Sequence, residues 1–185
     1  SDNQANLYGL YQTNSTFNNT VNNVISVNSE GTLVYGSYLT GTSNINFYNN
    51  TVLNNSTNVA TTVAAYVNGG SVGNNSVRNN IFAHLGGGRA YYVANLGNLY
   101  SDYNTLYSTG PVLVQSSATV TYANLTAWMN TAYWDLNSIS IRPALIGPAD
   151  PRPKLDEPDV WAIHGRGTQI VGNDYYFNNS PRPTT

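Results

Sequence analysis

The sequence predicts an all-β fold: a right-handed parallel β-helix, or solenoid, of about four to five coils with a short C-terminal capping helix and an extended C-terminal wrap. The first observation is a phrase that recurs along the 185-residue chain. It reads TFNNTV, FYNNTV, SVRNNIF and SDYNTL, and its aligned asparagines are Asn19, Asn50, Asn80 and Asn104. Repeat periods of about 20 to 50 residues indicate stacked structural units. The second observation is that residues 1–115 lack helical periodicity, which leaves β-strands to build the units.

A second recurring segment marks an earlier strand in each unit. It reads LYGLY, VYGSY, VAAYV and AYYV, beginning at Leu7, Val34, Val63 and Ala90. Large apolar residues stand two positions after the aligned asparagines: Val21, Val52, Phe82 and Leu106. This alternation predicts strand, turn, strand. A propeller blade would need about 40 residues and four strands, and a β-sandwich gives no reason for asparagines in register. We therefore expect coils at residues 7–32, 33–59, 60–88 and 89–110, and a degraded fifth coil at 111–122.

The aligned asparagines have a physical reason to recur. In a parallel β-helix each coil lies about 4.8 Å above the last, so equivalent residues stack in columns. Asparagine tolerates the left-handed backbone of a sharp bend. Its amide also carries a donor and an acceptor that can bond the asparagines above and below. We expect Asn19, Asn50, Asn80 and Asn104 to form a structural ladder that serves the bend and the stack together.

The composition excludes several classes of partner. Charged residues make up 9% of the chain and the formal net charge is −2, without a basic run that would attract nucleic acid. The chain has no cysteine, so it can form neither a disulfide nor a thiolate metal site. No apolar run reaches the roughly 20 residues of a membrane span. We expect no cofactor and no metal, and the bias toward Asn, Ser, Thr and Tyr fits an extracellular, secreted or cell-surface protein.

The chain divides into coils at residues 1–122 and a cap with a wrap at 123–185, which belong to the same domain. A helix is predicted over Asn124–Tyr133, with Asn124 as N-cap and Leu125, Trp128 and Met129 on one face. It would cover the open end of the solenoid. Beyond it, proline predicts an extended segment, with one possible strand at residues 168–171. Nothing at the N-terminal end resembles a cap, so we expect further coils before Ser1 in a longer chain.

The NN-I-F and DYN-x-L phrases, together with LTAWMNTAYWDLNSISIRPAL at residues 125–145, resemble the bacterial right-handed parallel β-helix repeat proteins of the pectate-lyase-like superfamily. The resemblance covers residues 1 to about 145. It implies the fold and a secreted or cell-surface setting. It does not imply an enzyme, because fold alone does not determine function.

One outward column is a candidate for carbohydrate contact: Phe17, Tyr48, Arg78 and Asp102, each two positions before an aligned asparagine. Aromatic faces beside hydrogen-bonding groups suit sugar rings, although exposed aromatic residues are also normal on a β-rich surface. Arg78 and Asp102 are open to two interpretations. They would be the base of a polysaccharide lyase and an acidic ligand beside it, or an exposed ion pair worth at most about 1 kcal/mol.

Other polar groups are weaker candidates for a catalytic or metal-binding role. The Asp-Asp and Gly-His-Gly phrases of glycoside hydrolases with this fold are missing. The HGRG tetrad at residues 164–167 comes nearest to them, but it lies outside the repeats. The acidic group Asp150, Asp156, Glu157 and Asp159 lacks the spacing of a calcium loop, which favours a solvated connection. His84 occupies the slot of Asn23, Asn54 and Ser108, where a polar turn residue is the simpler interpretation. We assign no catalytic residue.

The sequence thus favours a non-catalytic β-helix segment of a larger secreted or cell-surface bacterial protein that acts in adhesion or glycan contact. Its partner would be a polysaccharide or a cell-surface glycan. The alternative is the C-terminal part of a polysaccharide lyase or glycoside hydrolase, with catalytic coils upstream or chemistry at Arg78 and Asp102. Ice binding would require a threonine ladder in register, and TGT and ATT occur without one.

Overall fold

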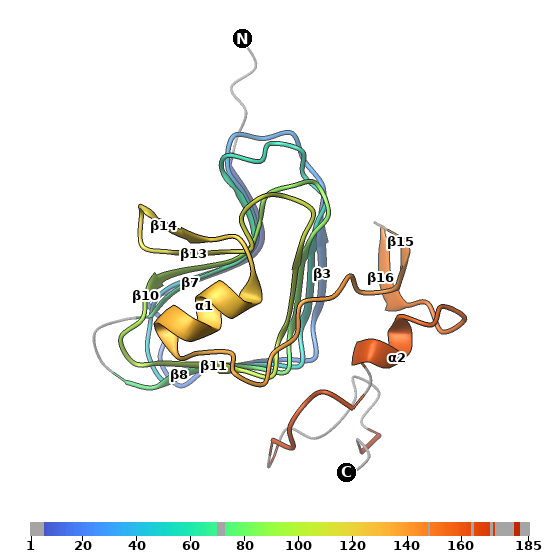
Figure 1. The fold of residues 1–185 in the computed structure, drawn as a ribbon. Helices are drawn as coiled ribbons and strands as arrows, with labels where there is room; N and C mark the ends of the chain where they lie inside the picture. Colours follow the sequence, from blue (N-terminus) through green and yellow to red (C-terminus); the bar gives the residue numbers. More distant parts are fainter. Residues whose placement is uncertain are drawn as a thin grey trace.

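The computed structural model shows a parallel β-solenoid of about four turns. It describes residues 6–69, 73–147, 149–163, 165–170, 172, 180 and 181. Each turn contributes one strand to each of three sheets, whose strand orders are β1-β4-β7-β10-β13-β14, β2-β5-β8-β11 and β3-β6-β9-β12. Figure 1 shows the coils superposed along the axis, with the N-terminal and C-terminal coils at opposite ends of the stack. The predicted fold class is confirmed.

The strands of each turn are short and follow the expected coil boundaries. They are β1 (Leu7–Thr13), β2 (Asn19–Val21) and β3 (Val24–Val27); β4 (Val34–Thr42), β5 (Asn46–Tyr48) and β6 (Thr51–Asn54); β7 (Thr62–Gly69), β8 (Asn75–Arg78) and β9 (Ile81–His84); β10 (Arg89–Asn95), β11 (Leu99–Asp102) and β12 (Thr105–Ser108). Each strand pairs in parallel with the equivalent strand of the next turn. Apolar and polar positions alternate, because successive side chains of a strand point to opposite faces.

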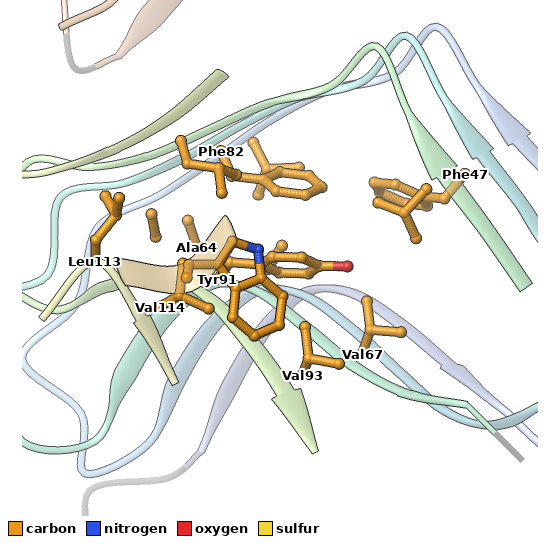
Figure 2. Packing of buried hydrophobic residues seen from close by; sticks show 14 of the residues in the cluster. Phe47, Ala64, Val67, Phe82, Tyr91, Val93, Leu113 and Val114 are labelled. Carbon is orange, nitrogen blue, oxygen red and sulfur yellow. The ribbon is translucent and has the colours of Figure 1, made fainter. Parts of the chain in front are cut away.

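The core fills the inside of the coils with columns of apolar residues. Val52, Phe82 and Leu106 stand in register and are fully buried. Figure 2 shows Phe47, Phe82 and Tyr91 converging in this interior, and the Phe82 and Tyr91 ring centres lie 5.3 Å apart. This packing holds the coils together and leaves their outer faces free to vary.

Left-handed residues form the corner between the second and third strand of each turn. Their φ values are 61° for Asn22, 57° for Asn49, 60° for Asn79 and 57° for Tyr103. They directly precede Asn23, Asn50, Asn80 and Asn104, whose side chains form the ladder described below. The bend and the stacking amide are therefore separate positions, which corrects the expectation that one asparagine serves both.

The C-terminal end of the coil stack is closed. Strand β13 (Val114–Ser116) adds to β10 in parallel, and β14 (Val120–Tyr122) turns back on it antiparallel. Helix α1 (Leu125–Ala132) follows, with the Asn124 side chain accepting a hydrogen bond from the Ala127 N–H and with Leu125 and Trp128 buried. The predicted helix and its N-cap are confirmed, and the antiparallel β14 replaces the degraded fifth coil.

The C-terminal segment carries more regular structure than proline content alone predicts. Strands β15 (Leu145–Gly147) and β16 (Asp150–Pro153) form an antiparallel pair, and α2 (Val160–Ile163) follows. Figure 1 places these elements beside β3, on the side away from β7 and β10. Thr168 to Ile170 are not a strand, and Val171, the last residue of that predicted strand, lies outside the described residues.

Candidate functional site

Hydrogen-bonded asparagines link the coils from within. Asn80 Oδ1 accepts hydrogen bonds from the Asn50 N–H and the Asn50 side-chain amide, at 2.9 and 3.1 Å. The Asn80 amide in turn donates to Phe47 O and to Asn104 Oδ1. Asn104 repeats the pattern by donating to Val77 O. Asn50, Asn80 and Asn104 are all buried, so this ladder satisfies groups that water cannot reach.

The first rung of the ladder is Asn23, which corrects the assignment of Asn19. The Asn23 N–H and side-chain amide both donate to Asn50 Oδ1 at 2.9 Å. Asn19 instead pairs in register with Asn46, and the side chains of exposed Asn19 and half-buried Asn46 share a hydrogen bond of 2.7 Å. The reason is the strand register: Val24 lies opposite Thr51, which sets Asn23 beside Asn50.

The ladder ends on a buried carboxylate. Asp135 accepts hydrogen bonds from Ser101, Asn104, Trp128 and Ser138, and none of its surface is exposed. Burial raises the pKa of the Asp135 carboxyl above its usual value, while the four donors oppose that shift. Because Trp128 belongs to α1, the carboxylate joins the cap helix to the last coil.

The alignment of Phe17, Tyr48, Arg78 and Asp102 in one column is only partly correct. Tyr48, Arg78 and Asp102 are register neighbours on β5, β8 and β11, but their first-coil neighbour is Val21. Phe17 lies before β2 at a left-handed corner with φ of 54°, and 82% of it is exposed. The same four-residue displacement that misplaced Asn19 misplaced Phe17.

Arg78 is held between two aromatic rings. Its guanidinium carbon lies 5.0 Å from the Tyr48 ring centre and 5.5 Å from that of Tyr100, within the range of cation–π attraction. Arg78 also donates to Ser76 Oγ and to the Tyr48 hydroxyl, at 3.1 and 3.2 Å. These contacts fix the side chain against the outer face of the β5-β8-β11 sheet.

Asp102 does not form the ion pair that the sequence allowed. Its carboxylate accepts hydrogen bonds from the Tyr103 N–H, the Asn137 N–H and the Asn137 side-chain amide, at 2.8 to 2.9 Å. The ion pairs of the described residues are Arg152–Asp150 and Lys154–Glu157, both in the C-terminal segment. Asp102 therefore anchors the loop after α1, and its register neighbour Arg78 bonds Ser76 and Tyr48 instead of the carboxylate.

A tyrosine face covers the outside of the six-stranded sheet. It consists of Tyr8, Tyr11, Tyr35, Tyr38, Tyr66 and Tyr92. Tyr11, Tyr38, Tyr66 and Tyr92 stand in register on β1, β4, β7 and β10. The Tyr11 and Tyr38 rings are stacked at 5.4 Å, and the Tyr38 and Tyr66 rings at 4.4 Å. Tyr92 meets Tyr66 edge-on at 5.0 Å, so one continuous aromatic column crosses four coils.

A shorter column runs beside the first. The Tyr8 and Tyr35 rings are stacked at 5.5 Å, and each meets the neighbouring Tyr11 or Tyr38 edge-on. Tyr11 is 53% exposed and the other five tyrosines are partly buried. Burial, and then neighbouring tyrosines, raise the pKa of Tyr35 and Tyr66. Their hydroxyls are therefore neutral near pH 7, where each can donate and accept a hydrogen bond.

A polar column flanks the aromatic one. Thr40, Asn68 and Asn95 lie in register two or three positions beyond Tyr38, Tyr66 and Tyr92. Hydrogen-bonding side chains thus accompany the rings along the axis of the solenoid. Sequence reasoning identified the repeated segments that carry these tyrosines but assigned them no site. A Tyr at or next to the end of LYGLY, VYGSY and VAAYV is the signal that would have found them.

The remaining predicted residues take structural positions. His84 is fully buried, in register with Asn54 and Ser108 but with Val27 in place of Asn23, so it is not an exposed turn residue. In the acidic group, Asp150 pairs with Arg152 and Glu157 with Lys154. His164 of the HGRG tetrad lies outside the described residues. Among the side chains that the structure describes, no group of three or more His, Cys, Asp or Glu could hold a metal ion.

The described helices are all too short or too polar to cross a membrane. No known family model matches the chain, and neither a curated protein nor a solved structure matches it. The resemblance to pectate-lyase-like proteins therefore rests on sequence phrases alone, and what the structure adds to it is the parallel β-solenoid.

Proposed function

We propose that the protein is a non-catalytic solenoid that binds a polysaccharide along its tyrosine face. The supporting observation is the column of Tyr11, Tyr38, Tyr66 and Tyr92, which places one aromatic side chain on each of four successive coils. Tyrosine offers an apolar ring and a polar hydroxyl, the pair of surfaces that a sugar also presents. A repeated ligand such as a linear polysaccharide matches a repeated contact.

The direction of the column supports a linear ligand lying along the solenoid axis. Columns of equivalent residues cross the strands at the coil spacing, about 4.8 Å. A chain of sugars lying on the column would meet a ring edge and a hydroxyl at each coil. Thr40, Asn68 and Asn95 supply hydrogen-bonding groups along one side. Many weak and equivalent contacts then give affinity through multivalency.

The charge of this face favours a neutral polysaccharide. The face consists of six tyrosines and contains no Asp, Glu, Lys or Arg, and burial raises the pKa of Tyr35 and Tyr66 above the usual value of tyrosine. Arg89 is the cation near the column, and its Nη1 donates to Ala60 O at 2.8 Å. A secreted or cell-surface bacterial setting, as in the pectate-lyase-like superfamily, would give such a face access to glycans.

An enzymatic function has weaker support. A lyase or hydrolase at Arg78 and Asp102 would need both groups available to the substrate. Arg78 is instead stacked between Tyr48 and Tyr100, and Asp102 accepts three hydrogen bonds from Tyr103 and Asn137. We therefore place the proposed contact on the tyrosine face and not on the Arg78 column.

The experiment is affinity electrophoresis of the purified chain through gels that contain neutral or acidic polysaccharides. Binding retards migration. We expect retention by at least one neutral polysaccharide, and we expect the double substitution Tyr38→Ala, Tyr66→Ala to weaken it about tenfold or more, which corresponds to about 1.4 kcal/mol. Tyr38→Phe keeps the ring and removes the hydroxyl, so it separates stacking from hydrogen bonding.

Tyr100→Ala is the matched control, because Tyr100 is 45% exposed on the β2-β5-β8-β11 sheet, outside the tyrosine face, and contacts Arg78. Thermal unfolding of each variant checks that the fold is retained. If Tyr100→Ala abolishes retention while the Tyr38 and Tyr66 substitutions leave it unchanged, the tyrosine face is the wrong surface. Release of reducing or unsaturated sugars by the wild-type chain would contradict a non-catalytic function.

A further inference from the structure

The tyrosine face brings phenol rings of successive coils into direct contact. Its ring centres lie 4.4 to 5.6 Å from those of their neighbours, either stacked or edge-on, and these contacts connect all six tyrosines. The closest two rings of the face are those of Tyr38 and Tyr66, whose centres are 4.4 Å apart and whose planes differ by 6°. Phenols held in contact can react with one another, which isolated tyrosines on a surface cannot do.

Strand register holds the Tyr38 and Tyr66 rings together. The two residues are register partners on β4 and β7, and adjacent strands lie about 4.8 Å apart, which sets the separation of the rings. The residues that follow them, Leu39 and Val67, are buried in the core, so the backbone beneath the rings is fixed. Both rings are themselves half-buried, so small solutes reach them. The pair is therefore preorganised and accessible at the same time.

The surroundings of the pair determine how it can be oxidised. Burial, and then the charge and the hydroxyl of Tyr38, raise the pKa of Tyr66 above its ordinary value. Tyr66 therefore keeps its proton near neutral pH, and the loss of an electron from its ring also requires the release of that proton. A tyrosine hydroxyl both donates and accepts hydrogen bonds, so the Tyr38 hydroxyl is a neighbouring group that can receive the proton.

The other rings of the face connect this pair to solvent. Tyr11 is 53% exposed, and its ring is stacked on that of Tyr38 at 5.4 Å. In the next coil, the Tyr92 ring meets that of Tyr66 edge-on at 5.0 Å. Because these groups are of the same kind, an electron passes between them with little change in free energy. A Tyr11 ring that has been oxidised can therefore take an electron from Tyr38, which moves the oxidation to the closely stacked pair.

We propose that the tyrosine face is a site of oxidative cross-linking, where a one-electron oxidant with a peroxide as final electron acceptor joins Tyr38 to Tyr66. Each phenol loses one electron and its hydroxyl proton. A ring carbon next to the oxygen-bearing carbon of one ring then bonds to the same carbon of the other, and each of these carbons passes its hydrogen to its own ring's oxygen, which restores both hydroxyls. Two electrons and two protons leave in total, and the peroxide takes up the two electrons as its O–O bond breaks. The new C–C bond joins two successive coils covalently.

The experiment oxidises the 185-residue chain with light-activated tris(bipyridyl)ruthenium, using persulfate as the peroxide. Dityrosine is measured by its fluorescence, and mass spectrometry of a peptic digest locates the linked peptides, which have lost two hydrogen atoms. We expect the Tyr38–Tyr66 link to be the most abundant one and to form within single chains. Because neighbouring rings react without a diffusional encounter, its yield should stay constant on about tenfold dilution. Oxidation in urea, where the strand register is lost, should lower the share of this link at least about threefold.

Two substitutions separate the pair from the general reactivity of exposed tyrosines. Tyr66→Phe keeps a ring in the stack but has no hydroxyl to oxidise, so the total dityrosine yield should fall at least about twofold. Tyr133→Phe is the matched control, because Tyr133 is 77% exposed and lies outside the tyrosine face; it should leave the yield unchanged. Links that form mainly between chains would overturn the proposal, as would an equal share of the Tyr38–Tyr66 link in folded and unfolded protein. So would a larger loss of dityrosine from Tyr133→Phe than from Tyr66→Phe.

Discussion

The imidazole of His84 is fully buried and uses one of its two ring nitrogens. Nδ1 accepts a hydrogen bond of 3.0 Å from the Gly88 N–H, so the proton of the neutral ring sits on Nε2. Nε2 has no partner among the described residues. Burial, and then the nearby charge of Arg89, lower the pKa of His84 to about 4. Protonating Nδ1 would break the bond to Gly88 and bury a charge.

This arrangement predicts acid destabilisation with a defined sign. The unfolded histidine binds a proton below about pH 6.5 and the folded one below about pH 4, so the stabilisation is complete above the first value and is lost as pH falls through the second. The loss approaches about 3 kcal/mol. Urea unfolding of wild type and of His84→Asn at pH 7 and pH 4 tests it. Between pH 7 and pH 4 the wild type should lose more free energy of unfolding than His84→Asn does. An equal loss in both chains would contradict the predicted role of His84.

Residue positions show where sequence reasoning fails. NNTV occurs at residues 18–21 and again at 49–52, and this identity suggested that Asn19 aligns with Asn50. The register instead follows from burial: Ile25 must face the core opposite Val52, which moves the ladder to Asn23. The constant spacing of 27 residues from Leu7 to Val34 and from Asn23 to Asn50 would have shown this. The contact of Asn79 with Thr168 has no sequence signal, because the two residues lie 89 positions apart.

At the scale of elements, the asparagine ladder joins successive coils by side-chain hydrogen bonds, in addition to the backbone pairing within the sheets. Asn80 is 1% exposed and takes part in hydrogen bonds to both neighbouring coils. Removing its side-chain amide takes away the Oδ1 that accepts from the Asn50 N–H and the Nδ2 that donates to Phe47 O. Asn104 Oδ1 loses one of two hydrogen bonds and keeps the one from the Asn80 N–H. Buried groups left unpaired are costly, so the ladder makes each coil depend on the next.

Asn80→Leu should therefore lower the free energy of unfolding by about 1 to 3 kcal/mol. Asn19→Leu is the control of the same chemistry, because its side chain is exposed and makes its bond with Asn46 at the surface; it should change stability by less than about 0.5 kcal/mol. Urea unfolding followed by tryptophan fluorescence measures both. Equal effects of the two substitutions would show that the ladder adds no stability beyond that of a surface amide.

The strands and the cap helix were predictable because their signals are local: a repeat period, an alternation, and Asn124 before an apolar face. The tyrosine face was not, because its importance lies in which residues of different coils share a side of the sheet. That depends on the register of β1, β4, β7 and β10. The hairpin of β15 and β16 within a proline-rich segment likewise depends on pairing that composition does not reveal.

At the scale of the whole molecule, the solenoid is a stack in which each coil contacts only its neighbours. Stability in such a stack is a sum of coil terms and interface terms, and an end coil has one interface fewer. The last coil gains a substitute partner from β14, α1 and the hydrogen bonds of Asp135. The first coil has β16 packed beside β3, but no added strand or helix pairs with or follows its outer edge among the described residues. Unfolding should therefore begin at the N-terminal edge.

Native-state hydrogen exchange tests this order. We expect hydrogen-bonded amides of β2 and β3 to exchange at least about tenfold faster than those of β11 and β12 under the same conditions. Trp128→Phe removes the indole that donates to Asp135 at 2.9 Å while keeping an aromatic ring in the core. It should speed exchange at β11 and β12 and leave β2 and β3 unchanged, because the disturbed interface lies several coils away. Uniform acceleration along the chain would mean that the solenoid opens as one cooperative unit, and the difference between its ends would then have no effect on how it unfolds.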